Sequence, residues 1–184
     1  GWTNLLEVFL ILLIPFALPR TYGVMVGDKR QGYTVLGAMA ILAIGSLVSL
    51  TALQMSFADN NLAAMEGKET RFGVLGSTLF ATATTLTSTG AVDSMHSSYE
   101  PLSGGLLIFN MLLGEISPGG VGSGLYGMLV VAIIGVFISG LMVGRSPEYM
   151  GKRIGPTEVK LISMYALVVP VVVLLGTGLS LIHI

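Results

Sequence analysis

The fold is decided by one segment of 21 residues without a charged side chain, Phe72–Val92, which reads FGVLGSTLFATATTLTSTGAV. Its length suits a membrane-spanning helix, since roughly 20 apolar residues cross a bilayer core. Its second half, Ala81–Gly90, nevertheless contains five Thr, one Ser and a terminal Gly. Hydroxyl side chains and a flexible backbone require polar partners, so this half is poorly suited to face lipid. We therefore expect it to face the interior of a membrane protein.

The composition of the rest of the chain supports a membrane protein. Of 184 residues, 53% are hydrophobic and only 10% are charged, and the mean hydropathy is +0.84. Soluble domains carry about 25% charged residues, so this chain cannot cover a water-facing surface. A net charge of −1 argues against nucleic-acid binding, and the absence of cysteine excludes disulfides, iron–sulfur clusters and thiol nucleophiles. The predicted fold class is an all-α integral membrane protein.

Four stretches are predicted to span the membrane as helices. Three contain no Asp, Glu, Lys or Arg and are long enough to cross once. The fourth is rich in Leu, Ile and Val but contains Glu7, Pro15, Pro19 and Arg20. The four are Leu5–Val26, Gln31–Ala58, Ile116–Gly144 and Leu161–Ile184.

A cluster of glycines interrupts the hydrophobic stretch Leu106–Val143. It also holds Pro118 and the acid Glu115, and together these residues should unwind a helix. Non-helical backbone at membrane depth is tolerated only against protein or along a water-filled path, so the cluster is predicted to line a pathway. Its glycines are Gly114, Gly119, Gly120, Gly122, Gly124 and Gly127.

The basic residues indicate how the chain crosses. Six of the nine Lys and Arg fall in two linkers, Lys29–Arg30 and Arg145–Lys160, and the positive-inside rule assigns both linkers to the cytoplasm. The two linkers share one side only if Phe72–Val92 enters the membrane and returns without crossing. Topology and composition thus both predict a re-entrant segment that opens to the outside, where Asp93 and Glu100 can raise the local cation concentration. His96 is expected to hydrogen-bond at this outer mouth.

A re-entrant helix points its carboxyl end, with its partial negative charge, at the bilayer centre. The return strand Thr87–Val92 consists of small residues whose main-chain carbonyls can line a narrow passage, and rings of carbonyls can replace the hydration shell of K⁺. One segment supplies only one wall, so several must meet at an axis. The alternative is a helix that merely packs, with its threonines bonded to their own preceding turn.

Four strings of the sequence resemble a known family. The pore segment Thr87–His96 resembles the third filter region of the potassium-binding subunit of the bacterial Kdp potassium-transporting P-type ATPase. The stretches Asn110–Glu115 and Gly119–Met128 are similar to that family's broken helix, and Gly140–Tyr149 is similar to the cytoplasmic turn that follows it. The resemblance runs through nearly the whole chain, which is accordingly expected to be an internal piece of such a protein.

The resemblance implies an architecture of four repeats, each with a helix, a pore helix, a filter strand and a second helix. This chain would hold about one and a half to two repeats of this potassium transporter superfamily. Residues 1–27 would be the last helix of one repeat, residues 28–145 a complete third-type repeat, and residues 146–184 a cytoplasmic linker and the next helix. Residues 179–184 match a translated sequencing-library adapter and are not expected to be native.

The resemblance also implies a function. The chain would select extracellular K⁺ and deliver it to the ATP-hydrolysing partner of a P-type ATPase complex. This complex would also include accessory subunits. The chain would be a multi-pass protein of the bacterial cytoplasmic membrane. Potassium would contact the carbonyls of Ser88, Thr89, Gly90 and Ala91. A gate or tunnel wall below would consist of Glu115, Gly119, Gly120, Gly122 and Gly124.

No phosphate-binding loop occurs in the sequence, so the chain is expected to be non-catalytic, to carry no cofactor and to depend on ATP used by its partner. The alternative function is the pore subunit of a channel or symporter of the Trk/Ktr/HKT group. An intramembrane serine enzyme with Ser123 and His96 is disfavoured, because Val121 stands where the nucleophile motif requires glycine.

The re-entrant path predicts which positions share a membrane face. In the full-length protein, cleared of any other cysteine, Lys29→Cys and Arg153→Cys should both react with a membrane-impermeant maleimide from the cytoplasmic side only. Glu100→Cys should react from the outside only. Labelling of the first two positions from opposite faces would show that Phe72–Val92 crosses the membrane.

Overall fold

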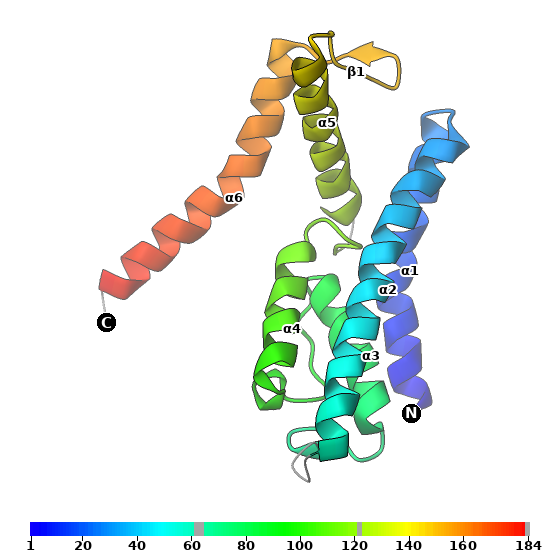
Figure 1. Cartoon of the computed structure of the whole chain (residues 1–184), viewed down its shortest axis with the longest axis vertical. Coiled ribbons are helices and arrows are strands. Elements are labelled where there is room, and N and C mark those ends of the chain that lie inside the picture. Colours follow the sequence, from blue (N-terminus) through cyan, green and yellow to red (C-terminus); the bar gives the residue numbers. More distant parts are fainter. Residues whose placement is uncertain (61–64, 121–122, 183–184) are drawn as a thin grey trace. The chain divides into compact units, whose positions relative to one another are not determined.

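The computed structural model describes residues 1–60, 65–120 and 123–182, almost all of them in helices or in short connections between helices (Figure 1). They fold as two compact units, Gly1–Met128 and Leu129–Ile184. The elements are α1 (Trp2–Met25), α2 (Lys29–Asn60), α3 (Gly73–Leu86), the 3₁₀ turn η2 (His96–Ser98), α4 (Pro101–Leu113), α5 (Ser123–Val143), the strands β1 (Glu148–Tyr149) and β2 (Lys152–Arg153), and α6 (Pro156–Ile182).

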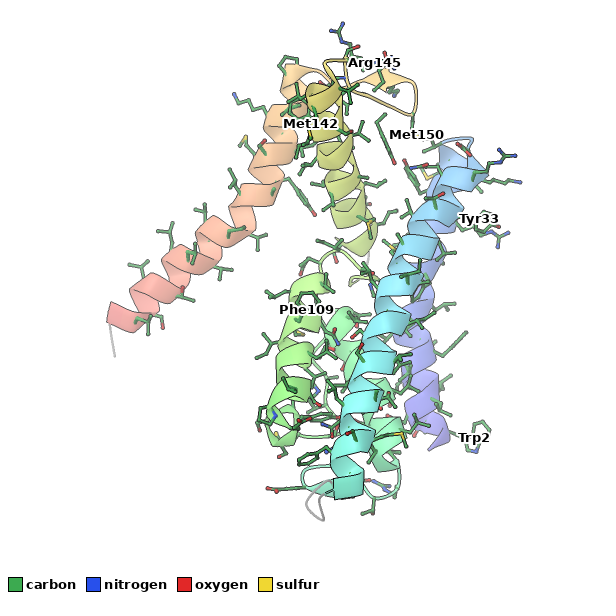
Figure 2. All side chains as sticks on the ribbon, viewed as in Figure 1. Trp2, Tyr33, Phe109, Met142, Arg145 and Met150 are labelled. Atoms are coloured by element: carbon green, nitrogen blue, oxygen red, sulfur yellow. The ribbon has the colours of Figure 1, made fainter. Side chains whose placement is uncertain are left out.

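Four helices are long and apolar enough to cross a membrane, as the sequence predicted. They are Trp2–Met25, Lys29–Ala58, Ser123–Val143 and Pro156–Leu181. Many of their large apolar side chains are exposed, as expected for surfaces that lie against lipid or further protein. In the first unit, the side chains of Trp2, Tyr33 and Phe109 project outward from the helices that carry them (Figure 2). The chain is an all-α membrane protein.

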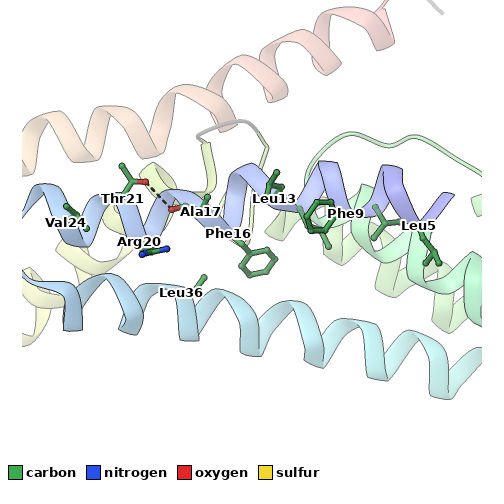
Figure 3. Close-up of a pocket in the computed structure, with 11 residues that line it drawn as sticks. Leu5, Phe9, Leu13, Phe16, Ala17, Arg20, Thr21, Val24 and Leu36 are labelled. Atoms are coloured by element: carbon green, nitrogen blue, oxygen red, sulfur yellow. Dashed lines mark hydrogen bonds between the residues drawn. The ribbon is translucent and has the colours of Figure 1, made fainter. Parts of the chain in front are cut away.

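In the first unit α1 and α2 lie side by side, and they meet most closely near the turn that joins them (Figure 1). A Cβ atom added to Gly32 would lie 2.6 Å from the carbonyl oxygen of Pro19 and 2.9 Å from the Cα of Gly23. Small residues permit such close approach of two helical backbones within a membrane. Beside this contact, α1 and Leu36 of α2 line an apolar groove of about 960 Å³ (Figure 3).

Helix α3 enters the first unit and stops part-way. Its 14 residues span about 21 Å, less than the ~30 Å hydrocarbon core of a bilayer. The chain then returns to the level at which α3 begins: the Met95 amide donates to the Gly67 carbonyl at 2.7 Å, and Lys68 pairs with Ser94 in an antiparallel bridge. The predicted re-entrant path is therefore present within this unit.

Helices α3 and α4 both run antiparallel to α2. Thr51 of α2 hydrogen-bonds Thr78 of α3 at 3.2 Å, and Ser46, further from the end of α2, bonds Asn110 of α4. Two small apolar clusters fill the space between the helices. One contains Leu50, Ala81, Tyr99 and Leu107, and the other contains Val8, Phe80 and Ala83.

The glycine cluster breaks the helix as predicted, but over a shorter stretch. Helix α4 ends at Leu113 and α5 begins at Ser123, so the prediction that Gly124 and Gly127 belong to the unwound part was wrong. Both glycines lie in the first turns of α5, where an added Cβ would collide with the carbonyl oxygens of Pro118 and Glu115 respectively. They serve close packing of a helix against the loop rather than unwinding.

In the second unit a hairpin connects α5 to α6. Helix α5 ends with Gly144 in the left-handed conformation (φ +71°), and the Arg145 amide donates to the Gly140 carbonyl at 3.0 Å, an arrangement that satisfies a free carbonyl at a helix end. Strands β1 and β2 then pair Glu148 with Arg153. This turn corresponds to the basic linker that the sequence predicted.

The close α1–α2 contact generates a stability prediction. Gly32→Ala should lower the free energy of unfolding by about 1–3 kcal/mol, because the added methyl group forces apart two packed backbones. Thermal unfolding of the full-length protein in detergent would measure the loss. Gly37→Ala is the matched control on the same helix, since nothing lies within 4 Å of a Cβ there. Equal unfolding temperatures for the two variants would contradict the proposed role of Gly32.

Candidate functional site

The segment after α3 has an unusual backbone. Ser88 and Gly90 both adopt left-handed conformations, with φ of +55° and +67°, a region in which a non-glycine residue such as Ser88 is uncommon. The amides of Thr89 and Gly90 both turn back to the Thr84 carbonyl, at 3.0 and 3.2 Å. The alternation of left-handed and ordinary residues thus folds the strand tightly against the end of the helix.

The last carbonyls of α3 are occupied. The Thr85 carbonyl accepts from the Ser88 amide at 3.2 Å, and the Leu86 carbonyl accepts from the Gly119 amide at 3.2 Å. A helix normally ends with four carbonyls that lack a partner within the helix. Here the returning strand and the glycine loop supply donors for those of Thr84, Thr85 and Leu86, so the partial negative charge of the helix end is largely paired.

The carbonyls of the returning strand are not occupied. Among the residues that the structure describes, no donor reaches the carbonyl oxygens of Ser88, Thr89, Gly90 or Ala91. Thr89, Gly90 and Ala91 are exposed on the surface of this unit, whereas Thr82–Thr87 are buried. Four successive unpaired carbonyls on an exposed, tightly bent strand can accept hydrogen bonds or coordinate a cation.

Three threonine hydroxyls at the end of α3 bond to the preceding turn of the helix. Thr84 donates to the Phe80 carbonyl at 3.0 Å, Thr85 to that of Ala81 at 2.6 Å and Thr87 to that of Ala83 at 2.8 Å. This is the pattern that the sequence analysis gave to a helix that only packs. It describes these three side chains correctly, whereas the hydroxyls of Thr82 and Ser88 are buried without a partner among the described residues.

The glycine loop lies directly against the inner end of this strand. An added Cβ at Gly114 would lie 2.5 Å from the Ser88 hydroxyl, and one at Gly120 would lie 3.2 Å from the Thr87 carbonyl. Gly119 is left-handed (φ +81°). The predicted residues Gly114, Gly119, Gly120 and Gly124 are therefore brought together beneath Thr87 and Ser88, while Gly122 lies outside the described residues.

Glu115 sits in this loop with an exposed side chain. Within the described ranges, its carboxylate has no hydrogen bond and no ion pair. A pairing of Glu115 with a buried base is not seen among these residues. An exposed, unpaired carboxylate beside the loop remains available to a cation.

A buried polar network connects α2, α3 and α4, and the sequence did not predict it. Asn110 of α4 is fully buried; its Oδ1 accepts from the Ser46 hydroxyl of α2 at 2.6 Å, and its Nδ2 donates to the Thr85 hydroxyl of α3 at 3.4 Å. Further along the chain, just after α4, the Ser117 hydroxyl donates to the Met39 carbonyl of α2 at 3.1 Å. A single Asn in an otherwise apolar helix was the signal available in the sequence.

At the outer end, the strand is tied to α1. The Asn4 amide donates to the Asp93 carboxylate at 3.1 Å, and the Ser94 hydroxyl bonds both that carboxylate, at 3.1 Å, and the Tyr99 hydroxyl, at 2.7 Å. The Lys68 ammonium lies 4.7 Å above the ring of Tyr99. Asp93 is therefore held in a structured mouth, although Asn4 was not a predicted partner.

Burial dominates the titration of this mouth. It raises the pKa of Asp93, against the opposing effect of the Asn4 and Ser94 hydrogen bonds, and it lowers the pKa of His96, against the attraction of Asp93. Burial also lowers the pKa of Lys68. Each shift favours the neutral form of a group that is partly removed from water.

The prediction that His96 hydrogen-bonds at the mouth was wrong for its Nε2 atom, which is buried without a partner among the described residues. The ring instead meets Tyr99 edge to face, with 6.1 Å between centroids. The Ser123 hydroxyl accepts from the Gly120 amide at 3.1 Å, a contact with the glycine loop that gives no support to a Ser123–His96 dyad.

The described residues contain no cluster of three or more His, Cys, Asp or Glu side chains that could hold a metal ion. The main-chain oxygens of Ser88–Ala91 are neutral ligands, the type that suits a monovalent cation.

Comparison with known proteins finds one family along the whole chain. The family described as the potassium-transporting ATPase A subunit matches residues 1–184. Three relatives carry the name potassium-transporting ATPase potassium-binding subunit: those of Clavibacter sepedonicus, Cutibacterium acnes and Frankia alni are 58%, 59% and 56% identical, each over 98% of this chain. The chain spans about a third of the length of these relatives, 33%, 33% and 32% respectively.

The lowered pKa of His96 predicts a pH-dependent mouth. The fold favours the neutral form of His96. The contribution of His96 to the stability of the mouth is therefore complete above the ordinary pKa of 6.5, and it is lost as the pH falls through the lower pKa of the folded state. Hydrogen exchange of the Met95 amide, corrected for intrinsic rates, should therefore show weaker protection at pH 5.5 than at pH 7.5.

In His96→Gln this decline should disappear. The Asp93→Asn variant is included because Asp93, with its raised pKa, acts in the opposite direction. The contribution of Asp93 to the stability of the mouth grows as the pH falls. The decline should therefore be steeper in Asp93→Asn than in the unmodified protein. An identical pH profile in the unmodified protein and His96→Gln would contradict the assignment.

Proposed function

This chain belongs to the family of potassium-transporting ATPase A subunits, and from that premise we propose that its segment Ser88–Ala91 forms one wall of a potassium filter. The whole assembly would take up K⁺ from outside the cell, and the filter would select the ion before it moves toward an ATP-hydrolysing partner. Because the chain spans about a third of its relatives, the other walls would come from the rest of the polypeptide.

The observation that carries the proposal is a contrast along one short stretch of backbone. The carbonyls of Thr84, Thr85 and Leu86 all accept hydrogen bonds, whereas among the described residues those from Ser88 to Ala91 accept none. A main-chain oxygen without a partner is costly in a membrane, by several kcal/mol each. A dehydrated K⁺ held by several neutral oxygens would compensate for that cost.

The exposure of the strand supports a shared pathway. Thr89, Gly90 and Ala91 lie at the surface of this unit, while the side of α3 that faces α2 and α4 is buried. A filter wall needs one face closed by protein and one face open to the ion. Equivalent segments that meet around an axis would complete the ring of oxygens.

The glycine loop is proposed as the gate or tunnel wall beneath the filter. Gly119 and Gly120 lie against the carbonyls of Leu86 and Thr87, and the exposed carboxylate of Glu115 would attract a cation that leaves the filter. Gly124 lets α5 begin immediately beside the loop. Gly122 is retained in this proposal on the resemblance alone.

Energy would have to come from a partner chain, because this sequence has no phosphate-binding loop. We propose that the partner is the ATP-hydrolysing chain of a P-type ATPase complex with accessory subunits in the bacterial cytoplasmic membrane. K⁺ would be the cargo, and the chain itself would carry no cofactor. Family membership favours this function over a pore of the Trk/Ktr/HKT group.

The filter proposal predicts that Gly90→Ala weakens potassium selection. Its φ of +67° is unfavourable for a residue with a Cβ, at about 1–2 kcal/mol, so relaxation would displace the neighbouring carbonyls. In the assembled full-length complex, the ratio of half-saturating K⁺ and Rb⁺ concentrations for ATPase stimulation should move toward one by about five- to tenfold. Gly90→Asn should retain more selectivity, since Asn tolerates this conformation.

Gly73→Ala is the matched control for this experiment. Gly73 has nearly the same φ, +65°, and neither glycine has an atom within 4 Å of an added Cβ. It lies at the other end of α3, so its replacement should change stability without changing the K⁺/Rb⁺ ratio. An unchanged ratio in Gly90→Ala, or an equal change in both variants, would count against the filter.

A further inference from the structure

The network around Asn110 joins three helices at the depth where α3 ends. Asn110 is fully buried, Thr85 is 1% exposed and Ser46 is 8% exposed. The amide accepts from one partner and donates to the other, at 2.6 Å and 3.4 Å. Thr85 in turn donates to the Ala81 carbonyl at 2.6 Å, so every hydroxyl in the chain of bonds has a partner.

The direction of these bonds determines which side chain fits. The Ser46 hydroxyl donates to Oδ1, so position 110 needs an acceptor on one side. The Thr85 hydroxyl already donates to the Ala81 carbonyl, so it can only accept from position 110. A primary amide supplies one acceptor and one donor in a fixed geometry, which neither an aliphatic side chain nor an ionised carboxylate provides.

The network acts on the base of the strand that bears the open carbonyls. Thr85 is the residue whose carbonyl accepts from the Ser88 amide, and Ser88 is the first of the four residues proposed to contact the ion. A shift of the last turn of α3 would therefore move Ser88 and the residues after it. Asn110 connects that turn to the long helix α2, through its hydrogen bonds to Thr85 and Ser46.

We propose that Asn110 is a positioning residue for ion selection, which it exerts through Thr85 without touching the ion. This inference rests on the proposed filter function. Without the Asn110 side chain, the end of α3 would keep its hydrophobic contacts but lose its registration against α2. The carbonyls of Ser88–Ala91 would then adopt a wider range of positions, and discrimination between cations of similar size would fall.

Two variants remove the link from its two ends. Asn110→Leu keeps the branching and the number of side-chain heavy atoms and removes both bonds, and Thr85→Val keeps the shape and removes only the hydroxyl. Each should shift the K⁺/Rb⁺ ratio of ATPase stimulation toward one by about fivefold, the factor that corresponds to the ~1 kcal/mol of a typical hydrogen bond. The double variant should show little more than either single change, because both remove the same link.

Thr78→Val is the matched control. Thr78 is equally buried on the same helix, and its hydroxyl also reaches α2, through Thr51 at 3.2 Å. It lies about two turns nearer the start of α3, away from the filter strand. Its replacement should reduce thermal stability as Thr85→Val does but leave the K⁺/Rb⁺ ratio unchanged, and Thr85→Ser, which restores the hydroxyl, should restore the ratio.

The outcomes separate the two proposals. If Gly90→Ala leaves the ratio unchanged, the filter itself is refuted, and this inference with it. If Gly90→Ala shifts the ratio but Asn110→Leu and Thr85→Val do not, only the role of Asn110 is overturned. That role is also overturned if Thr78→Val shifts the ratio as much as Thr85→Val. Should Asn110→Leu fail to assemble, the comparison of the Thr85 and Thr78 variants decides the question.

Discussion

Within a bilayer, each main-chain polar group needs a partner from the protein, from trapped water or from a bound ion, because lipid supplies none. This constraint organises the centre of the structure. Helix α3 is too short to cross a bilayer, and its end is closed by amides of Ser88, Thr89, Gly90 and Gly119. Among the described residues, the carbonyls of Ser88–Ala91 form a run of four successive oxygens that no donor reaches. The proposed site lies at these carbonyls.

The same constraint explains the threonines of α3. A threonine hydroxyl in a helix can return its proton to a carbonyl one turn earlier and so needs no other partner. Thr84, Thr85 and Thr87 all do this, which lets a polar sequence lie buried between three helices. The composition that looked unsuitable for lipid is suited to a short helix surrounded by protein, with its oxygen-rich end directed at the interior.

Much of this arrangement could be predicted from the sequence, because hydropathy and glycine content act over whole segments. The re-entrant path and the broken helix were both anticipated on that basis. Contacts between distant residues could not be anticipated: Asn4 and Asp93 are 89 positions apart, and Asn110 looked like one polar residue in an apolar run. Nor does composition reveal which glycines unwind a helix and which allow close packing, so Gly124 and Gly127 were misassigned.

The two sides of the strand base are held by different kinds of contact. On one side Asn110 and Ser46 hold the end of α3 with buried hydrogen bonds to a long helix. On the other side the strand rests on Gly114 and Gly120, which present only backbone to it, and the Gly119 amide donates to the Leu86 carbonyl. A selective wall requires fixed oxygens, whereas a gate below it requires a loop that can move. In the proposed function, the side-chain bonds would fix the filter wall and the glycine loop would form the gate, both at the base of a single strand.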